Sequence, residues 1–307
     1  MNIALLKQLV QIQAASGNEK PMFDFLLQHI ENEKHTWKQQ PVLYFGDEYQ
    51  DNLVVVLGKP QTAIFAHLDS VGFTVRYDNK IVPIGGPEVE NGYELVGEDS
   101  QGKIETKMVY DESNHYLAVD FQRPIDRGTN LTFKSNFVDN EEFVQTCYLD
   151  DRLGILNCLE ILPELENVMV FFTTYEEVGG GAIPLLLNKI YPKHPFKYAL
   201  ISDITWITEG VQPGKGVVIS MRDKNVPRKS FIDTICSLAK DSQISFQLEV
   251  EASGSSDGRE IHHSPYPIDW VFIGAAEENV HSPFEKVNKK DFESMKLMYK
   301  YLVKKLI

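Results

Sequence analysis

The chain has 307 residues, of which 43% are hydrophobic, and its formal net charge is −14 at pH 7. A chain of this length and composition can form one large domain, or one domain that carries a smaller inserted one. The negative charge argues against nucleic acid and against anionic membrane surfaces as partners, because phosphate groups bind to basic faces.

The cysteines and the N-terminal segment bear on the cellular compartment. Cys147, Cys158 and Cys236 are widely spaced and form no CxxC pair, which predicts reduced thiols rather than a disulfide framework. The first dozen residues predict an amphipathic surface helix and lack the features of a signal peptide. No apolar run reaches the length of a membrane span. We therefore expect a soluble, cytoplasmic protein.

Residues 1–70 combine helical and strand patterns. A second helix is predicted from about residue 18 to residue 30, and apolar runs at 53–57 and 62–66 predict strands. The second strand leads into His67, with Asp69 two residues later. A lone histidine here is more often structural than functional. The nearby carboxylate favours a functional role, because it can hold an imidazole ligand in one tautomer.

Between residues 71 and 146 the helical periodicity disappears. Short apolar runs alternate with glycine, proline, asparagine and aspartate, a pattern typical of small twisted strands and tight turns. From residue 147 onwards, helices and strands alternate again. The predicted organisation is an α/β domain in two parts, residues 1–70 and 147–307, with a β-rich domain of residues 71–146 inserted between them.

Several predicted strands of the α/β part end in potential metal ligands. The buried run that begins at Val170 ends in the adjacent acids Glu176 and Glu177, followed by three glycines. For that pair alone, two solvated carboxylates at the end of a strand are equally plausible. The pair Asp150-Asp151 precedes a predicted helix, and capping of that helix would by itself be enough to explain the two acids. The full set of strand-end residues is His67, Asp150, Glu176, Glu177, Asp203 and His281.

Together these side chains place two imidazoles and four carboxylates at one edge of the predicted sheet, where ligands bind in open α/β folds. Four like charges in one crevice favour a bound cation. Mixed histidine and carboxylate ligands suit zinc, cobalt or manganese better than calcium or magnesium. Five ligands with one bridging carboxylate can hold two metal ions about 3.5–4 Å apart, which leaves one carboxylate as a general base.

The motifs also resemble a known family. The segments AHLDSVGF, YLDDRLG, TTYEEVGGGA, ISD, GSSDGREIHHS and NVHSPFE are similar, in this order, to the motifs of the M42 family of dinuclear metallo-aminopeptidases. The resemblance covers essentially the whole chain. It implies an α/β/α sandwich of the zinc-peptidase type with an inserted, small β-barrel-like domain. It also implies hydrolysis of N-terminal residues from peptides with a free N-terminus.

The resemblance assigns a role to each candidate residue. His67, Asp150 and Asp203 would bind one metal ion, and Asp150, Glu177 and His281 the other, so that Asp150 bridges two divalent ions, most plausibly zinc. Glu176 would be the general base of a water activated by the metals. Asp69 would support His67, and Asp151 resembles the acid that follows the bridging ligand, often across a cis peptide. Asp257 and Gly258 would lie beside the substrate pocket.

Two departures from the family pattern affect these expectations. The family usually has an acid where this chain has Ser70, which bears on the pocket and not on the metal ligands. The chain and its insert are also shorter than usual. Because the insert of relatives contributes to large tetrahedral dodecamers, the resemblance implies a homo-oligomer but leaves the dodecamer open.

Other readings stay open at this point. The same metals could serve a carboxypeptidase or an N-acyl amino acid deacylase, or a non-catalytic binding or assembly protein. Two carboxylates could also hydrolyse glycosides without metal. The remaining histidines, which have no partners at ligand spacing or lie in loops, are assigned structural or exposed positions: His29, His35, His115, His194, His262 and His263. The cysteines are interpreted as buried small residues.

Overall fold

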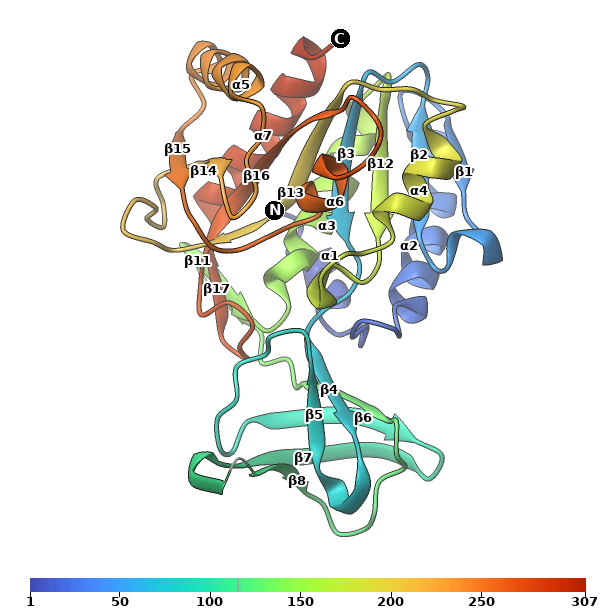
Figure 1. Ribbon diagram of the computed structural model, residues 1–307, viewed down its shortest axis with the longest axis vertical. Coiled ribbons are helices and arrows are strands. Elements are labelled where there is room, and N and C mark those ends of the chain that lie inside the picture. Colours follow the sequence, from blue (N-terminus) through green and yellow to red (C-terminus); the bar gives the residue numbers. More distant parts are fainter. Residues whose placement is uncertain (115) are drawn as a thin grey trace.

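The computed structural model describes residues 1–114 and 116–307. His115, which the sequence left without a ligand role, lies outside the described residues. The chain forms two parts, a larger one that contains both termini and a smaller one built mainly of strands (Figure 1). Each part contains its own β-sheet.

The larger part is built on a sheet of eleven strands, counted over the described residues. Its centre is parallel: β12, β3, β13 and β16 lie side by side in that order. Antiparallel strands extend both sides of this centre. The strands are β1 (Pro41–Tyr44), β2 (Leu53–Leu57), β3 (Thr62–His67), β10 (Val138–Asp139), β11 (Phe143–Thr146), β12 (Val168–Thr173), β13 (Tyr198–Trp206), β14 (Val217–Arg222), β15 (Phe246–Val250), β16 (Asp269–Glu278) and β17 (Glu285–Asn288).

Helices cover both faces of this sheet, so every residue of β3 is buried. Because strand side chains alternate between faces, Ile64 and Ala66 pack with one layer of helices and Ala63 and Phe65 with the other. The first layer contains α1 (Ile3–Leu9), α2 (Lys20–Glu33), α3 (Leu149–Ile161), α5 (Lys229–Ser242) and α7 (Lys289–Lys305). The second contains α4 (Ile183–Ile190) and α6 (Gly258–His262).

Six short 3-10 helices in the described ranges complete the helical elements. They are η1 (Lys34–Thr36), η2 (Asp47–Tyr49), η3 (Tyr77–Asn79), η4 (Glu112–Asn114), η5 (Leu162–Glu164) and η6 (Glu176–Val178). The last of these contains the paired glutamates and directly follows the parallel strand β12. The α/β/α sandwich predicted from the sequence is therefore confirmed.

The smaller part is an antiparallel sheet of six strands in the order β5-β4-β9-β6-β7-β8. Alternation in β7 buries Ile104, Thr106 and Met108 on one face, as a half-exposed strand requires. A bridge between Lys80 and Ala118 brings the two edges of the sheet together into a barrel-like form. The strands are β4 (Gly72–Val75), β5 (Ile81–Ile84), β6 (Glu94–Asp99), β7 (Gly102–Asp111), β8 (Tyr116–Asp120) and β9 (Asn130–Phe133).

The end of the inserted region differs from the sequence prediction. The smaller sheet ends at Phe133, whereas the β-rich insert was expected to extend to residue 146. Strands β10 and β11 pair in the larger sheet, where β11 lies beside β17. The apolar side chain of Val144 explains this placement, because it is buried in the core of the larger part. The last part of the range 71–146 therefore does not belong to the smaller sheet.

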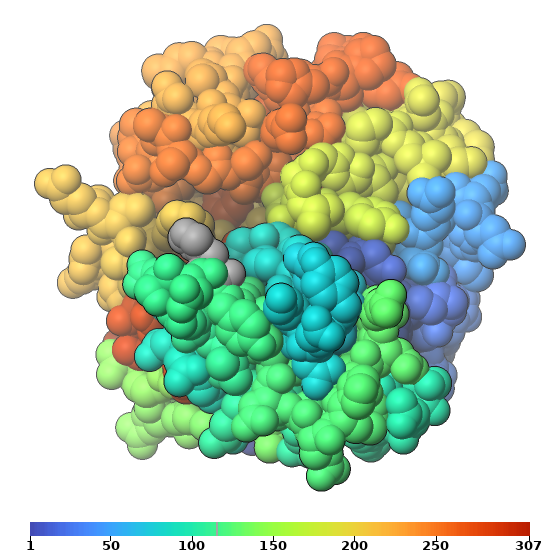
Figure 2. Space-filling model, turned by 60° about the horizontal axis from the view of Figure 1, so that its bottom comes forward, coloured from blue at the N-terminus to red at the C-terminus, as the bar shows by residue number. Residues whose placement is uncertain are grey.

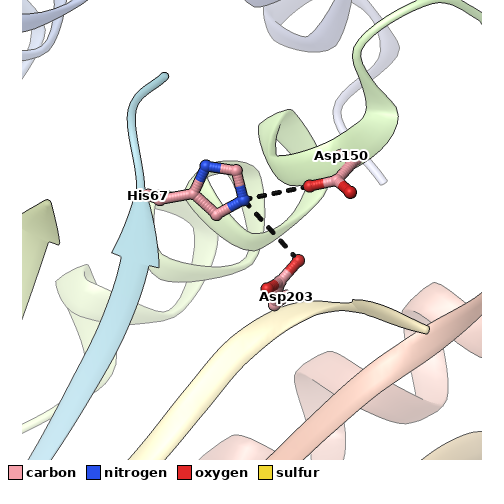
Figure 3. Close-up of side chains that lie close together, drawn as sticks. All are labelled: His67, Asp150 and Asp203. Carbon is pink, nitrogen blue, oxygen red and sulfur yellow. Dashed lines mark hydrogen bonds and ion pairs between the residues drawn. The ribbon is translucent and has the colours of Figure 1, made fainter. Parts of the chain in front are cut away.

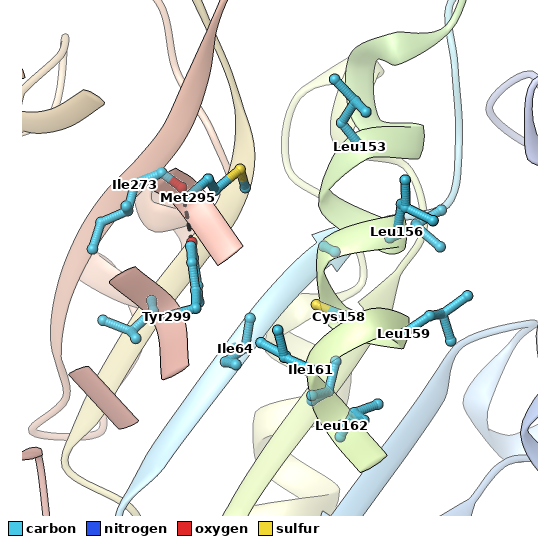
Figure 4. Close-up of a cluster of buried hydrophobic side chains, with 14 of the residues drawn as sticks. Ile64, Leu153, Leu156, Cys158, Leu159, Ile161, Leu162, Ile273, Met295 and Tyr299 are labelled. Carbon is cyan, nitrogen blue, oxygen red and sulfur yellow. Dashed lines mark hydrogen bonds between the residues drawn. The ribbon is translucent and has the colours of Figure 1, made fainter. Parts of the chain in front are cut away.

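The largest core cluster lies between the sheet and helices α3 and α7. Leu153, Leu156 and Leu159 of α3 belong to it (Figure 4). The Tyr299 hydroxyl of α7 shares its one hydrogen between the backbone carbonyls of Ile201 and Ile273, at 2.6 and 2.9 Å. This helix is thus tied to β13 and β16, two strands that lead to the candidate site. Within the described residues, no helix has the length and apolar character needed to cross a membrane.

We expect Leu156→Ala to lower the free energy of unfolding by about 2–5 kcal/mol, because it leaves a cavity under α3. Leu156 is 0% exposed. The matched control is Leu297→Ala on α7, where the side chain is 50% exposed and the expected change is within about 0.5 kcal/mol. Urea unfolding followed by circular dichroism measures both. Equal effects of the two substitutions would contradict the packing described here.

Candidate active site

Parallel pairing brings His67 and Asp203 together. Strands β3 and β13 are in register from Thr62 opposite Tyr198 to Phe65 opposite Ile201. Two residues further along, His67 Nε2 lies 3.9 Å from Asp203 Oδ1. Both side chains share the face of Phe65 and Ile201, the side covered by α4 and α6. They meet at the carboxyl edge of the parallel strands, as the sequence predicted for open α/β sheets.

Asp150 lies between two histidines. It sits at the start of α3, where its backbone is not yet helical. One carboxylate oxygen, Oδ1, lies 3.0 Å from His67 Nε2 (Figure 3). The other, Oδ2, lies 3.3 Å from Nε2 of His281, and this imidazole is also 3.2 Å from Glu177 Oε2. The structure therefore brings all five predicted metal ligands together, with Asp150 common to two groups.

The tautomer of each histidine follows from its second ring nitrogen. Nδ1 of His67 faces the backbone carbonyl of Asp69 at 3.2 Å, and Nδ1 of His281 faces the carbonyl of Gly86 at 3.1 Å. A carbonyl oxygen can only accept, so Nδ1 carries the hydrogen in both rings. Each Nε2 can then present its lone pair to a metal ion, and the carbonyl fixes the orientation of the ring.

Asp69 fixes the segment that carries the paired glutamates. Its Oδ1 accepts a hydrogen bond from the backbone N–H of Glu176, and its Oδ2 accepts one from that of Glu177, both at 3.1 Å. The Ser16 hydroxyl donates to the same carboxylate at 2.6 Å. Asp69 thus connects three segments of the chain. Its predicted role as a support for His67 describes only part of its contacts.

Asp151 points to the backbone and not to the other carboxylates. It accepts hydrogen bonds from the N–H of His67 at 3.1 Å and from that of Gly154 at 2.8 Å. The peptide bond between Asp150 and Asp151 is cis. Two neighbouring acids therefore have different tasks: one side chain faces the histidines, and the other ties α3 to the end of β3.

Glu285 is a further anchor, which the strand-end pattern of the sequence does not reveal. Its Oε2 accepts from the backbone N–H groups of Leu149 and Asp150 at 2.6 and 3.3 Å, and its Oε1 accepts from the N–H of His281 at 3.0 Å. One buried carboxylate thus fixes the segments of both Asp150 and His281. The only signal in the sequence was its place at the end of the NVHSPFE motif, four residues after His281.

The electrostatics of the cluster reflect crowded negative charge. Burial raises the pKa of Glu177 and Asp203, and the nearby Asp150 raises both further. Burial alone would lower the pKa of His67 and His281, but the surrounding carboxylates together outweigh it and raise the pKa of each: Asp150, Asp69 and Asp203 for His67, and Asp150 and Glu177 for His281. The two histidines in turn hold the pKa of Asp150 below its usual value despite burial. Bound cations stabilise the charged form of carboxylates that are buried close to one another.

The donor set fits two divalent cations. The ligand atoms of His67, Asp150 and Asp203 lie within 4.8 Å of one another, and so do those of Asp150, Glu177 and His281. Both groups combine imidazole nitrogen with carboxylate oxygen, which suits zinc and neighbouring transition metals. A carboxylate that belongs to both groups is what a two-metal site needs.

The chain also matches a family model. The model of the M42 glutamyl aminopeptidases aligns with residues 98–298, more than half of the chain. The chain belongs to the M42 glutamyl aminopeptidase family. Membership confirms the resemblance that the motifs indicated, and with it the predicted class of enzyme, an aminopeptidase and therefore a hydrolase.

Relatives of this M42 chain cover it from end to end. A protein of Acetivibrio thermocellus, provisionally named an aminopeptidase, is 25% identical over an alignment of 331 positions that spans 94% of each chain. An aminopeptidase structure from Desulfurococcus kamchatkensis has a TM-score of 0.84 at 22% identity, covering 99% of this chain and 94% of its own. The TET1 peptidase of Pyrococcus horikoshii, described as able to assemble into a tetrahedron or a large octahedral shell, has a TM-score of 0.82 at 22% identity over 98% of both chains.

A cavity of about 430 Å³ opens beside the two ligand groups. Glu176, the predicted base, lines it together with all five predicted ligands, and so does Asp257. Asp257 accepts a hydrogen bond from the Thr173 hydroxyl at 2.6 Å, and burial raises its pKa to about 6. Gly258 is not among the described residues that line the cavity. Its Cα packs against Trp270, whose ring would lie 2.4 Å from an added Cβ.

The remaining histidines contribute no atoms to this cavity in the part of the chain that is described. His194 lies 2.8 Å from the Tyr44 hydroxyl through its Nε2. His262 lines a separate hollow beside Trp270 and packs against His263. Cys147 and Cys158 are buried, Cys236 is partly buried, and all three are free. Among the described residues, neither ligand group contains any of these side chains.

In this M42 chain we expect Glu285→Gln to weaken metal binding roughly 10- to 100-fold. An amide has one acceptor oxygen where the carboxylate has two, so the backbone of Asp150 or of His281 loses its anchor. Titration calorimetry with Zn²⁺ measures the effect. Glu278→Gln, a partly exposed acid paired with Lys286 at 2.8 Å, is the control and should bind zinc as the wild type does. Unchanged zinc affinity in Glu285→Gln would contradict the anchoring role.

Proposed function

We propose that the chain is a metal-dependent aminopeptidase that removes the N-terminal residue from peptides with a free N-terminus. The observation that carries this proposal is the arrangement of two histidine–carboxylate groups that share Asp150, with Glu176 in the same cavity. Membership of the M42 family supports the type of reaction.

The residues assigned to the metal ions are His67, Asp150 and Asp203 for one, and Asp150, Glu177 and His281 for the other. Zinc is the proposed metal, and cobalt or manganese have compatible preferences. When bound, the two ions would polarise the scissile carbonyl and lower the pKa of the attacking water. Asp69 and Glu285 hold the ligand-bearing segments in place through their backbone hydrogen bonds.

Glu176 is the proposed general base. Its backbone is fixed by Asp69, and its side chain lines the cavity beside the ligand groups. It is therefore placed to accept a proton from the attacking water and to deliver it to the leaving amine. Glu177, the next residue, lies within reach of His281 instead. The two glutamates divide the roles of base and ligand.

The charge of the cavity supports an aminopeptidase over a carboxypeptidase. Its lining includes acids outside the ligand groups, such as Asp257 and Glu260, whereas its cationic side chains are few. One of them, Arg259, lies 3.5 Å from Glu260. A surplus of carboxylates attracts a protonated α-amino group and repels a C-terminal carboxylate. An N-acylated substrate would lack the positive charge that this surplus favours.

We also propose that the protein forms a homo-oligomer. The support is the TET1 peptidase of Pyrococcus horikoshii, which is described as able to form a tetrahedron or a large octahedral shell. A tetrahedral dodecamer is one assembly of this kind. The three free cysteines suit a reducing compartment, and we propose the cytoplasm.

We expect Glu176→Gln to retain two metal ions per chain and to lose at least 10²-fold in kcat, because it removes the proton acceptor but no ligand. The neighbouring substitution Glu177→Gln should lose metal as well as activity. Metal content by mass spectrometry and hydrolysis of aminoacyl p-nitroanilides measure the two effects.

Four outcomes would contradict the proposed mechanism. Full activity of Glu176→Gln would remove Glu176 as the base, and fewer than one ion per wild-type chain would remove the two-metal site. Two ions with activity only on N-acyl amino acids would support the deacylase. Two ions with no activity on any substrate tested would support a non-catalytic homologue.

A further inference from the structure

One region of the cavity has no part in the ligand groups. It is built by β13, β14, β15 and β16 on the side of the sheet that faces α4 and α6. Register places Ser220 of β14 between Glu249 of β15 and Phe272 of β16, so the three residues form a row across the strands. Thr205 lies on β13, two residues beyond Asp203. We call these four residues the side pocket.

Glu249 is the buried acid of the side pocket. Glu249 is 5% exposed, and its Oε1 accepts a hydrogen bond from the Thr205 hydroxyl at 2.6 Å. No ion pair of Glu249 occurs in residues 1–114 or 116–307. Burial raises the pKa of Glu249, and the bond from Thr205 opposes this rise. A buried carboxylate without a cation is costly unless a partner binds it.

Ser220, the strand neighbour of Glu249, is the second polar group of the side pocket. The residue is 2% exposed, and it lines the cavity. Its hydroxyl lies close enough to Glu249 to lower the pKa of that acid, but its oxygen makes no hydrogen bond of normal geometry among the described residues. Buried hydroxyl groups are satisfied in nearly all proteins. A ligand that donates hydrogen bonds could use the lone pairs of Ser220 and of Glu249 together.

The remaining lining suits a long side chain with a positive end. Phe272 offers an aromatic wall for an alkyl stem. Two further acids, Asp223 and Glu251, line this region beside the exposed Lys224. Arg222, which does not line the cavity, also lies close to Asp223 and donates to its backbone carbonyl at 3.1 Å. The charge of the region is therefore negative, with its most deeply buried carboxylate at Glu249.

We propose that the side pocket binds the side chain of the substrate's N-terminal residue and selects lysine or arginine. This proposal rests on the function proposed above. Asp203 and Thr205 are two residues apart on one strand, a separation of about 7 Å. An extended lysine side chain spans about 6 Å from Cα to Nζ, counted from its bond lengths. A residue whose carbonyl lies at the ligand groups can thus reach Glu249 with its ammonium.

The test compares kcat/KM for the p-nitroanilides of lysine, arginine, leucine and glutamate. The zinc-loaded wild type should favour lysine and arginine over leucine roughly tenfold or more, and should cleave the glutamate substrate least. Glu249→Gln should lower kcat/KM for lysine roughly 10- to 100-fold, the range of a hydrogen bond to a charged group. Its kcat/KM for leucine should change less than about threefold.

Two further variants keep the test decisive. Ser220→Ala removes one hydrogen-bond acceptor for the ammonium and should lower kcat/KM for the lysine substrate but not for the leucine substrate. This variant keeps the test decisive in the case that Glu249→Gln does not fold. Glu209→Gln, an exposed acid that does not line the cavity, is the control and should match the wild type on every substrate.

The possible failures are distinguishable. If the kcat/KM of the wild type for the leucine or glutamate substrate equals its kcat/KM for lysine, the selectivity is refuted and the aminopeptidase function stands. If Glu249→Gln and Ser220→Ala leave a lysine preference unchanged, the side pocket is not its source. If the metal-loaded wild type cleaves none of the four substrates, the proposed function fails, and this inference fails with it.

Discussion

The carboxylate of Asp150 between two imidazoles is the contact on which the site depends. Its two oxygens lie 3.0 and 3.3 Å from the Nε2 atoms of His67 and His281. These three residues come from the end of β3, the start of α3 and the turn after β16. Their side chains can meet only if the strand register, the start of the helix and the turn are all held in place. Asp151 and Glu285 hold them through backbone N–H groups, and Asp69 holds the neighbouring segment of Glu176 and Glu177 in the same way.

The smaller sheet is coupled to this contact. The loop after β5 supplies the carbonyl of Gly86 that fixes the ring of His281, and the N–H of Glu88 donates to the His281 carbonyl at 2.9 Å. Figure 2 shows the cyan and green surface of the smaller sheet beside the yellow-green segment after β12 and the orange segment after β15. The smaller part thus reaches the candidate active site directly, which gives it a positioning role in addition to any role in assembly.

Much of the site was readable from the sequence because parallel strands gather their carboxyl ends at one edge. His67, Glu177 and Asp203 each follow an apolar run, and all three line the same cavity at that edge. Glu285 was missed because two of its three hydrogen bonds to backbone N–H groups join segments 135 and 136 residues away. Ser16 was missed for the same reason, since its partner Asp69 lies 53 residues further on. Strand patterns carry no information on such pairings.

The side pocket and the end of the insert show the same limit. Glu249 belongs to a short strand, and its partner β14 is in the sequence simply another apolar run. The alignment of Glu249 with Ser220 and Phe272 follows only from the register of the paired strands. Val144 reads equally well as part of a small barrel or of a large sheet. Its burial in the core of the larger part places it in the large sheet. In both cases tertiary packing selected among local patterns that were equally acceptable.

Anomalous diffraction at the zinc edge, from crystals grown with Zn²⁺, tests the central claim most directly. The account predicts two ions per chain on either side of the Asp150 carboxylate, one next to His67 and Asp203 and one next to Glu177 and His281. A single ion, or two ions of which only one contacts Asp150, would contradict it.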